Sequence, residues 1–194
     1  MSAWDFVTDF GDSAVTVPLA LLTFGFLLTA AARRIAFAWA MAVGGCAAAI
    51  GGLKVVFATC GPLVPHVLSP SGHTAMSTIV YGALAVLVGE RLPPRRRPLL
   101  AAAAGLAVVG IGLSRWMLRD HSLAEIIAGF GVGMIALLFF RARLGGDEPP
   151  PLPLKGLLLS AALLVAVMHG TRWMVEPAVH RLAWHIRVAL PWCR

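Results

Sequence analysis

Six long apolar stretches constrain the fold of this chain more than any other feature of its sequence. A helix of about 20 residues crosses the roughly 30 Å hydrocarbon layer of a bilayer, and most of the stretches approach that length. Backbone polar groups in lipid must be satisfied within the segment, which requires helices. We therefore predict an all-α fold, a polytopic membrane helix bundle with about six transmembrane helices. The stretches cover about residues 13–32, 35–58, 73–91, 98–116, 121–141 and 156–175.

The composition leaves too little charged surface for a water-soluble globule of this size. Of the 194 residues, 59% are hydrophobic and 13% are charged, and the mean hydropathy is +0.83. Soluble domains are roughly 45–50% apolar and about 25% charged. The net charge of +7 comes mostly from arginines at the ends of apolar stretches, which is typical of lipid head-group contacts and not of nucleic-acid binding. We expect a single membrane domain over residues 1–194.

The two ends of the chain differ in character. The N-terminal segment carries Asp5, Asp9 and Asp12 but no basic residue, which argues against a cleavable signal peptide. Residues 179–190 place apolar side chains on one helical face and basic side chains on the others. This pattern predicts an amphipathic C-terminal helix on the membrane surface.

The positive charges predict an orientation in the membrane. Cytoplasmic loops carry an excess of lysine and arginine. Nine of the 16 basic residues follow the first, third and fifth apolar stretches, so we assign these loops to the cytoplasm and both termini to the outside. The nine are Arg33, Arg34, Arg91, Arg95, Arg96, Arg97, Arg141, Arg143 and Lys155.

Glycines recur within several of the apolar stretches. Small residues let helix backbones approach closely in a membrane. We expect such positions to lie between packed helices. They include Gly44, Gly45, Gly51, Gly52, Gly105, Gly110 and Gly112.

Three polar clusters interrupt the apolar pattern. The first two flank the loop between the second and third stretches, and the third spans the loop between the fourth and fifth. Two membrane crossings separate these loops, so both lie on the outward face. The topology therefore gathers every cluster on one side. The clusters are Lys54 with Gly61-Pro62, then Pro70-Ser71-Gly72-His73, then Ser114-Arg115 with His121 and Glu125.

His121 and Glu125 have the spacing of an oriented nucleophile. Residues four apart on a helix can touch. A carboxylate that binds one ring nitrogen fixes the tautomer of the histidine and leaves the other nitrogen free to attack. His73 follows a turn and opens a helix, whose N-terminus suits an oxyanion.

The other cluster residues fit a bound phosphoryl group. Lys54 and Arg115 can neutralise its oxygens, and arginine can do so with two parallel hydrogen bonds. Gly72 lets the backbone approach closely, and Ser71 can donate its hydroxyl. Phosphoryl transfer depends mainly on such positioning and charge stabilisation.

The clusters resemble the three signature motifs of the type 2 phosphatidic acid phosphatase superfamily, the lipid phosphate phosphatases. The family pattern is K-x6-R-P, then P-S-G-H, then S-R-x5-H-x3-D, and the match covers residues 54–125, roughly a third of the chain. Gly61 stands where the family usually has arginine, and Glu125 stands where it usually has aspartate.

The resemblance implies a metal-independent and cofactor-free phosphatase. In this reading His121 forms a phosphohistidine, Glu125 orients it, and His73 is the general acid and then the general base. The implied substrates are lipids with a phosphomonoester or diphosphate, such as undecaprenyl diphosphate, phosphatidic acid, phosphatidylglycerophosphate or lipid A. The Ala/Arg-rich composition suggests a bacterial cytoplasmic membrane, with the active site facing the periplasm.

Two alternatives stay open at this point. A lipid phosphotransferase would use the same phosphohistidine but deliver the phosphoryl group to a second lipid or sugar. A catalytically inactive member would serve in lipid binding or transport, and only the missing arginine at Gly61 favours it. Arg119 lies in the same outward loop as Arg115, and its long side chain is a candidate for the missing cation. The alternative is that Arg119 is a solvated loop charge or binds neighbouring lipid head groups. The oligomeric state is not predicted.

Overall fold

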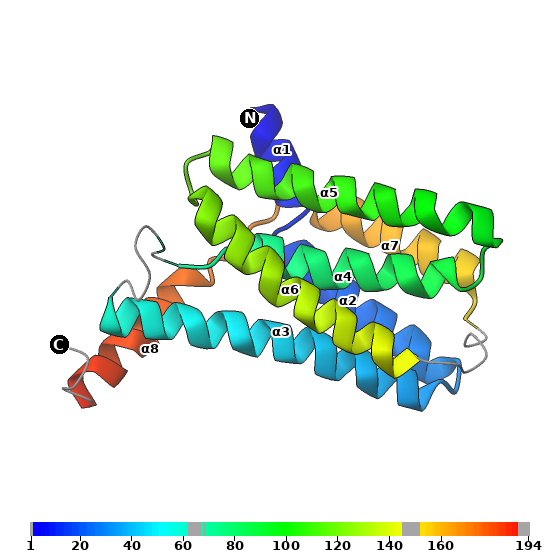
Figure 1. Cartoon of the computed structure of the whole chain (residues 1–194), viewed down its shortest axis with the longest axis horizontal. Coiled ribbons are helices and arrows are strands. Elements are labelled where there is room, and N and C mark those ends of the chain that lie inside the picture. The colour runs from blue at the N-terminus through cyan, green and yellow to red at the C-terminus, as the bar shows by residue number, and fades with distance from the viewer. Residues whose placement is uncertain (1, 62–66, 68, 145–151, 190–194) are drawn as a thin grey trace.

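The computed structural model describes residues 2–61, 67, 69–144 and 152–189, and it confirms the all-α fold. Figure 1 shows the elements as a bundle of helices, most of which run along its long axis. In chain order they are α1 (Ala3–Asp9), α2 (Ser13–Thr29), α3 (Arg33–Cys60), α4 (Gly72–Gly89), η1 (Pro94–Arg96), α5 (Arg97–Met117), α6 (Leu123–Leu144), α7 (Leu154–Met168) and α8 (Glu176–Ala189).

Five helical segments in the described part of the chain are long and apolar enough to cross a membrane. They are α1 with α2, then α3, α4, η1 with α5, and α6. The sixth predicted span is shorter than its apolar stretch suggests. Helix α7 has 15 residues, about 22 Å of length, because it ends at Met168 and is followed by Gly170 in a left-handed conformation with φ 84°. The predicted count of six is therefore approximate.

Helix α4 lies at the centre of the bundle and packs against α2, α3, α5 and α6. The six residues of α4 that follow His73 are all buried. They include three with polar side chains, Thr74, Ser77 and Thr78. Trp39 of α3 and Phe140 of α6 meet edge to face with ring centroids 5.6 Å apart in the same core. The helix that carries His73 is thus enclosed by its neighbours.

The polar clusters and the basic loops lie at opposite ends of the bundle, as the topology predicts. Figure 1 shows the C-terminal ends of α3, α5 and α7 at one end of the bundle, together with the starts of α4, α6 and α8. The opposite end holds the junctions of α2 with α3 and of α4 with α5. The predicted catalytic residues belong to the first end, and Arg33, Arg34 and η1 belong to the second.

Two glycines of α6 bring that helix against the backbone of α4. A Cβ atom on Gly129 would lie 2.3 Å from the carbonyl oxygen of Ser71, and one on Gly133 would lie 2.5 Å from that of Ala75. Neither distance is tolerable, so both positions need glycine. Most of the glycines that we predicted at close helix contacts do not lie at one. A Cβ atom would meet nothing within 4 Å at five of the seven positions: Gly44, Gly45, Gly51, Gly52 and Gly105.

The predicted C-terminal amphipathic helix is α8, which begins at Glu176 and packs against α3. Ala183 is buried in this contact, whereas Leu182 and Trp184 are exposed. Residue 190 of the predicted segment lies outside the described residues.

Candidate active site

The imidazole of His121 is fixed by Glu125, as their spacing predicts. His121 Nδ1 lies 3.0 Å from Glu125 Oε2, and both side chains are largely buried. The backbone N–H of His121 donates to the carbonyl oxygen of Arg115 at 3.2 Å, which holds the loop between α5 and α6. This geometry leaves Nε2 of His121 as the ring nitrogen available for attack.

Glu125 also joins the second and third clusters. Its Oε1 accepts a hydrogen bond from the Ser69 N–H at 2.8 Å, and its Oε2 accepts one from the Ser122 N–H at 2.9 Å. Its carbonyl oxygen accepts a bond from the Ser71 N–H at 3.0 Å. The loop before α4 is therefore tied to the first turn of α6, close to His121.

His73 sits in the first turn of α4, where Ser71 is the N-cap. The Ser71 hydroxyl accepts hydrogen bonds from the Thr74 N–H at 3.4 Å and from the Thr74 hydroxyl at 3.0 Å. Ser71 is fully buried, so in this structure its hydroxyl caps the helix. Gly72 follows it as the first residue of α4, and a Cβ there would contact the Lys54 side chain at 3.6 Å.

Asp12 is a site residue that the sequence analysis did not assign. Its Oδ2 lies 3.5 Å from Nε2 of His73. Its Oδ1 accepts hydrogen bonds from the Ala14 N–H at 2.8 Å, as N-cap of α2, and from the Trp173 N–H at 3.0 Å. The available signal was an N-cap aspartate at the outward end of the first apolar stretch.

Arg115 is held by two side chains and keeps one donor without a partner among the described residues. Its Nη1 donates to the Thr8 hydroxyl at 3.2 Å and pairs with Asp120 at 3.0 Å. Its Nε is buried and has no hydrogen-bond acceptor in the part of the chain that the structure describes. A buried donor without a partner costs about 1–3 kcal/mol, and a bound anion would remove that cost.

Lys54 lies near the end of α3 and is 8% exposed. Its ammonium donates to the Ser69 hydroxyl at 3.2 Å and forms an ion pair with Glu176 at the start of α8. The lysine therefore faces the loop that Glu125 holds.

The structure does not bring Arg119 into this group of residues. Its side chain is exposed, and its backbone adopts a left-handed conformation with φ 60°. The role of Arg119 as a phosphate-binding cation stays a prediction. Gly61, the other residue of that prediction, is the C-cap of α3 with φ 79° and ψ −173°.

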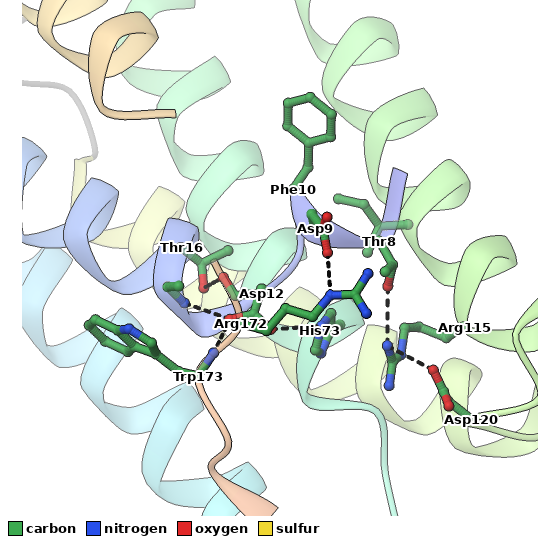
Figure 2. A network of polar contacts seen from close by, with 12 residues as sticks. Thr8, Asp9, Phe10, Asp12, Thr16, His73, Arg115, Asp120, Arg172 and Trp173 are labelled. Atoms are coloured by element: carbon green, nitrogen blue, oxygen red, sulfur yellow. Dashed lines mark hydrogen bonds and ion pairs between the residues drawn. The ribbon is translucent and has the colours of Figure 1, made fainter. Parts of the chain in front are cut away.

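A cavity of about 320 Å³ opens beside His73 and Arg115. Figure 2 shows the polar network around it, in which Arg172 and Trp173 reach in from the segment after α7. The lining thus combines the N-terminal segment, α4, α5 and the segment before α8. The lining residues are Asp5, Thr8, Asp12, His73, Arg115, Leu118, Asp120 and Arg172.

The surroundings of His121 favour its neutral form. Burial is the main cause that lowers its pKa, and the charges of Lys54 and Arg115 lower it further, whereas the hydrogen bond to Glu125 raises it. The net result is a pKa below the usual value of a histidine, so the imidazole is neutral and nucleophilic at neutral pH.

Histidine, cysteine and carboxylate side chains do not gather into a metal site within the described residues. No group of three or more of them is placed to hold a metal ion there.

One known protein family matches the part of the chain that holds the three clusters. The PAP2 superfamily profile matches residues 35–145, which is more than half of the chain and includes all three clusters. The chain therefore belongs to the PAP2 superfamily, whose members are phosphatases.

Two curated relatives are similar to parts of the chain. An uncharacterized 22.5 kDa protein of the cps region of Klebsiella pneumoniae is 27% identical over 140 residues, which is 71% of this chain and 67% of that protein. Phosphatidylglycerophosphatase B of Bacillus subtilis (strain 168) is 33% identical over 81 residues, which is 41% of this chain and 38% of that protein. No solved structure matches the chain.

Proposed function

We propose that this protein is a membrane phosphatase that hydrolyses a lipid phosphomonoester or diphosphate through a phosphohistidine on His121. The contact of His121 Nδ1 with Glu125 at 3.0 Å carries this proposal, because it orients a buried neutral imidazole as a nucleophile. Membership of the PAP2 superfamily supports the same reaction class.

In the first step Nε2 of His121 attacks phosphorus, and the bond between phosphorus and the leaving oxygen breaks. His73 donates a proton to that oxygen, so the lipid leaves as an alcohol or as a shorter phosphate. Glu125 stabilises the charge that develops on the ring of His121.

In the second step water attacks the phosphohistidine and the N–P bond breaks. His73, now neutral, accepts the proton of the water, and inorganic phosphate leaves. Both histidines then return to their starting protonation states.

Side-chain cations supply the charge stabilisation in this proposal, so no metal is required. Lys54 and Arg115 neutralise the phosphoryl oxygens, and the unpartnered Nε of Arg115 is one donor for them. Gly72 and the N-terminus of α4 bring backbone N–H groups close. Ser71 and Arg119 remain further candidates for phosphate contacts.

The substrate reaches the site from within the bilayer, with its tail among the spanning helices and its phosphate at their outward end. The name of the Bacillus relative makes phosphatidylglycerophosphate the first substrate to test. Undecaprenyl diphosphate, phosphatidic acid and lipid A follow from the motif resemblance. We place the protein in a bacterial cytoplasmic membrane with the site facing the periplasm.

Phosphate release by the purified protein from vesicles that contain each lipid tests the proposal. We expect release from at least one lipid, insensitivity to chelators and inhibition by vanadate, which adopts the five-coordinate geometry of the transfer. Product analysis distinguishes free phosphate from a phosphorylated acceptor, which would indicate a phosphotransferase. Binding without turnover of every lipid would indicate an inactive lipid-binding member.

A further inference from the structure

The first motif lacks its arginine, and the backbone at that position is one that arginine avoids. Gly61 has φ 79° and ψ −173°, a region of backbone space that is essentially restricted to glycine. A side chain there would strain the backbone. A third cation for the phosphoryl oxygens therefore has to come from another part of the chain.

Arg172 lies where such a cation is needed. It lines the same cavity as His73 and Arg115, although it comes from the segment after α7. Figure 2 shows its guanidinium reaching toward Asp9, on the side of the network that holds His73 and Arg115. Arg172 lies outside the three motifs and outside the matched family region, which ends at residue 145.

Two aspartates of α1 hold Arg172 in place. Its Nε donates to Asp9 Oδ1 at 2.7 Å, and its Nη2 donates to Asp5 Oδ1 at 3.2 Å. Asp9 is 1% exposed, so the pair is anchored inside the protein at one end, whereas the arginine is half-exposed. The hydrogen bonds of Arg172 to the described residues use Nε and Nη2, which leaves Nη1 to donate to a ligand.

The neighbouring residue fixes the segment a second time. The N–H of Trp173 donates to Asp12 Oδ1 at 3.0 Å, and Asp12 also contacts His73. The backbone that carries Arg172 is therefore tied to the residue that holds His73. This arrangement preorganises the guanidinium relative to the reacting groups, as electrostatic stabilisation of a transition state requires.

We propose that Arg172 is a phosphate-binding residue that supplies the cation absent at Gly61, with Asp9 and Asp5 as its positioning residues. The proposal rests on the proposed function. Together with Lys54 and Arg115, Arg172 covers the negative charge that spreads over three equatorial oxygens in phosphoryl transfer.

Orthovanadate binding to the purified full-length chain, measured by calorimetry, tests this role without requiring turnover. The main variant is Asp9→Asn combined with Arg172→Gln, because removing Arg172 alone would leave a buried carboxylate unpaired. We expect at least tenfold weaker binding with Tm close to that of the wild type. Arg172→Lys should weaken binding about threefold to tenfold, because one ammonium replaces a fork of donors. Arg181→Gln on α8 is the control and should bind normally.

A structural clamp between α1 and the segment after α7 is the competing explanation. It predicts a lower Tm but unchanged vanadate affinity in the folded variants. Binding within twofold of the wild type by either folded variant would overturn the role of Arg172. Wild-type protein that binds vanadate through Arg172 but releases no phosphate from any lipid would contradict the proposed function alone.

Discussion

Lys54 and Arg115 are each paired with a carboxylate. Lys54 pairs with Glu176, and Arg115 pairs with Asp120 at 3.0 Å. A phosphate would replace these carboxylates as the partner of the cations. The cations would then keep an anionic partner throughout, so that none is left as an unpaired buried charge.

Glu125 is expected to orient His121 and not merely to hold the loop. Glu125→Gln should lower kcat by about 10²–10⁴, the range typical of acid–base assistance, because an amide cannot stabilise the charged ring. Steady-state kinetics and circular dichroism would be measured together. Glu90→Gln, which removes a carboxylate paired with Arg97 at the opposite end, is the control. An unchanged kcat would remove Glu125 from the mechanism.

The pH dependence of kcat/KM reports the protonation of His121. Its pKa is lowered by burial and by the charges of Lys54 and Arg115, so the acid limb should lie below the usual value of about 6.5. Activity is lost as pH falls through this limb, because the protonated ring cannot attack.

Removing the charge of Lys54 should raise the pKa of His121. The residual activity of Lys54→Met is therefore expected to have its acid limb at higher pH than the wild type. Lys155→Met, at the opposite end of the bundle, should leave the limb in place. A limb that stays fixed or moves to lower pH in Lys54→Met would contradict the assignment of the limb to His121.

At the scale of elements, the contact between α4 and α6 positions the loop that precedes α4. Gly129→Ala would place a methyl group against the carbonyl oxygen of Ser71, whose N–H donates to Glu125. We expect a loss of about 1–3 kcal/mol in stability and reduced kcat, because α6 has to move away from the loop.

Gly131 gives a matched control on the same helix. A Cβ there would meet nothing within 4 Å, so Gly131→Ala should be neutral or slightly stabilising through helix propensity. Thermal unfolding in detergent would be measured for both variants. Equal Tm values for the two variants would refute the packing argument.

Hydropathy and charge predicted most of the elements, because lipid imposes length and composition directly on spanning helices. The C-terminal end of α7 was predicted too far along the chain. Apolar residues recur after His169, whereas the backbone turns at Gly170. Five of the seven glycines expected at helix contacts have no close neighbour, for a related reason. Which face of a helix is packed depends on tertiary contacts that periodicity does not specify.

The parts of the site that residues close in sequence form could be predicted. The parts that distant segments form could not. His121 and Glu125 are one helical turn apart, so their contact followed from spacing. Asp12 and Arg172 lie far from the motifs in sequence, and only tertiary packing brings them to the same cavity as His73 and Arg115.

For the whole molecule, the distribution of positive charge predicts which end faces the cytoplasm. In a variant whose native cysteines are replaced by alanine, Thr171→Cys should react with an impermeant thiol reagent on intact cells. Arg95→Cys should react only after permeabilisation. The reverse pattern would place the active site in the cytoplasm.

The central claim is that His121 carries the phosphoryl group, and trapping of the phosphoenzyme tests it most directly. Wild-type protein quenched during turnover of a radiolabelled lipid phosphate should carry an acid-labile, alkali-stable phosphoryl group on His121, and it should release inorganic phosphate. His121→Ala should show neither signal while still binding the lipid. Phosphate release by His121→Ala at a rate near that of the wild type would contradict the account.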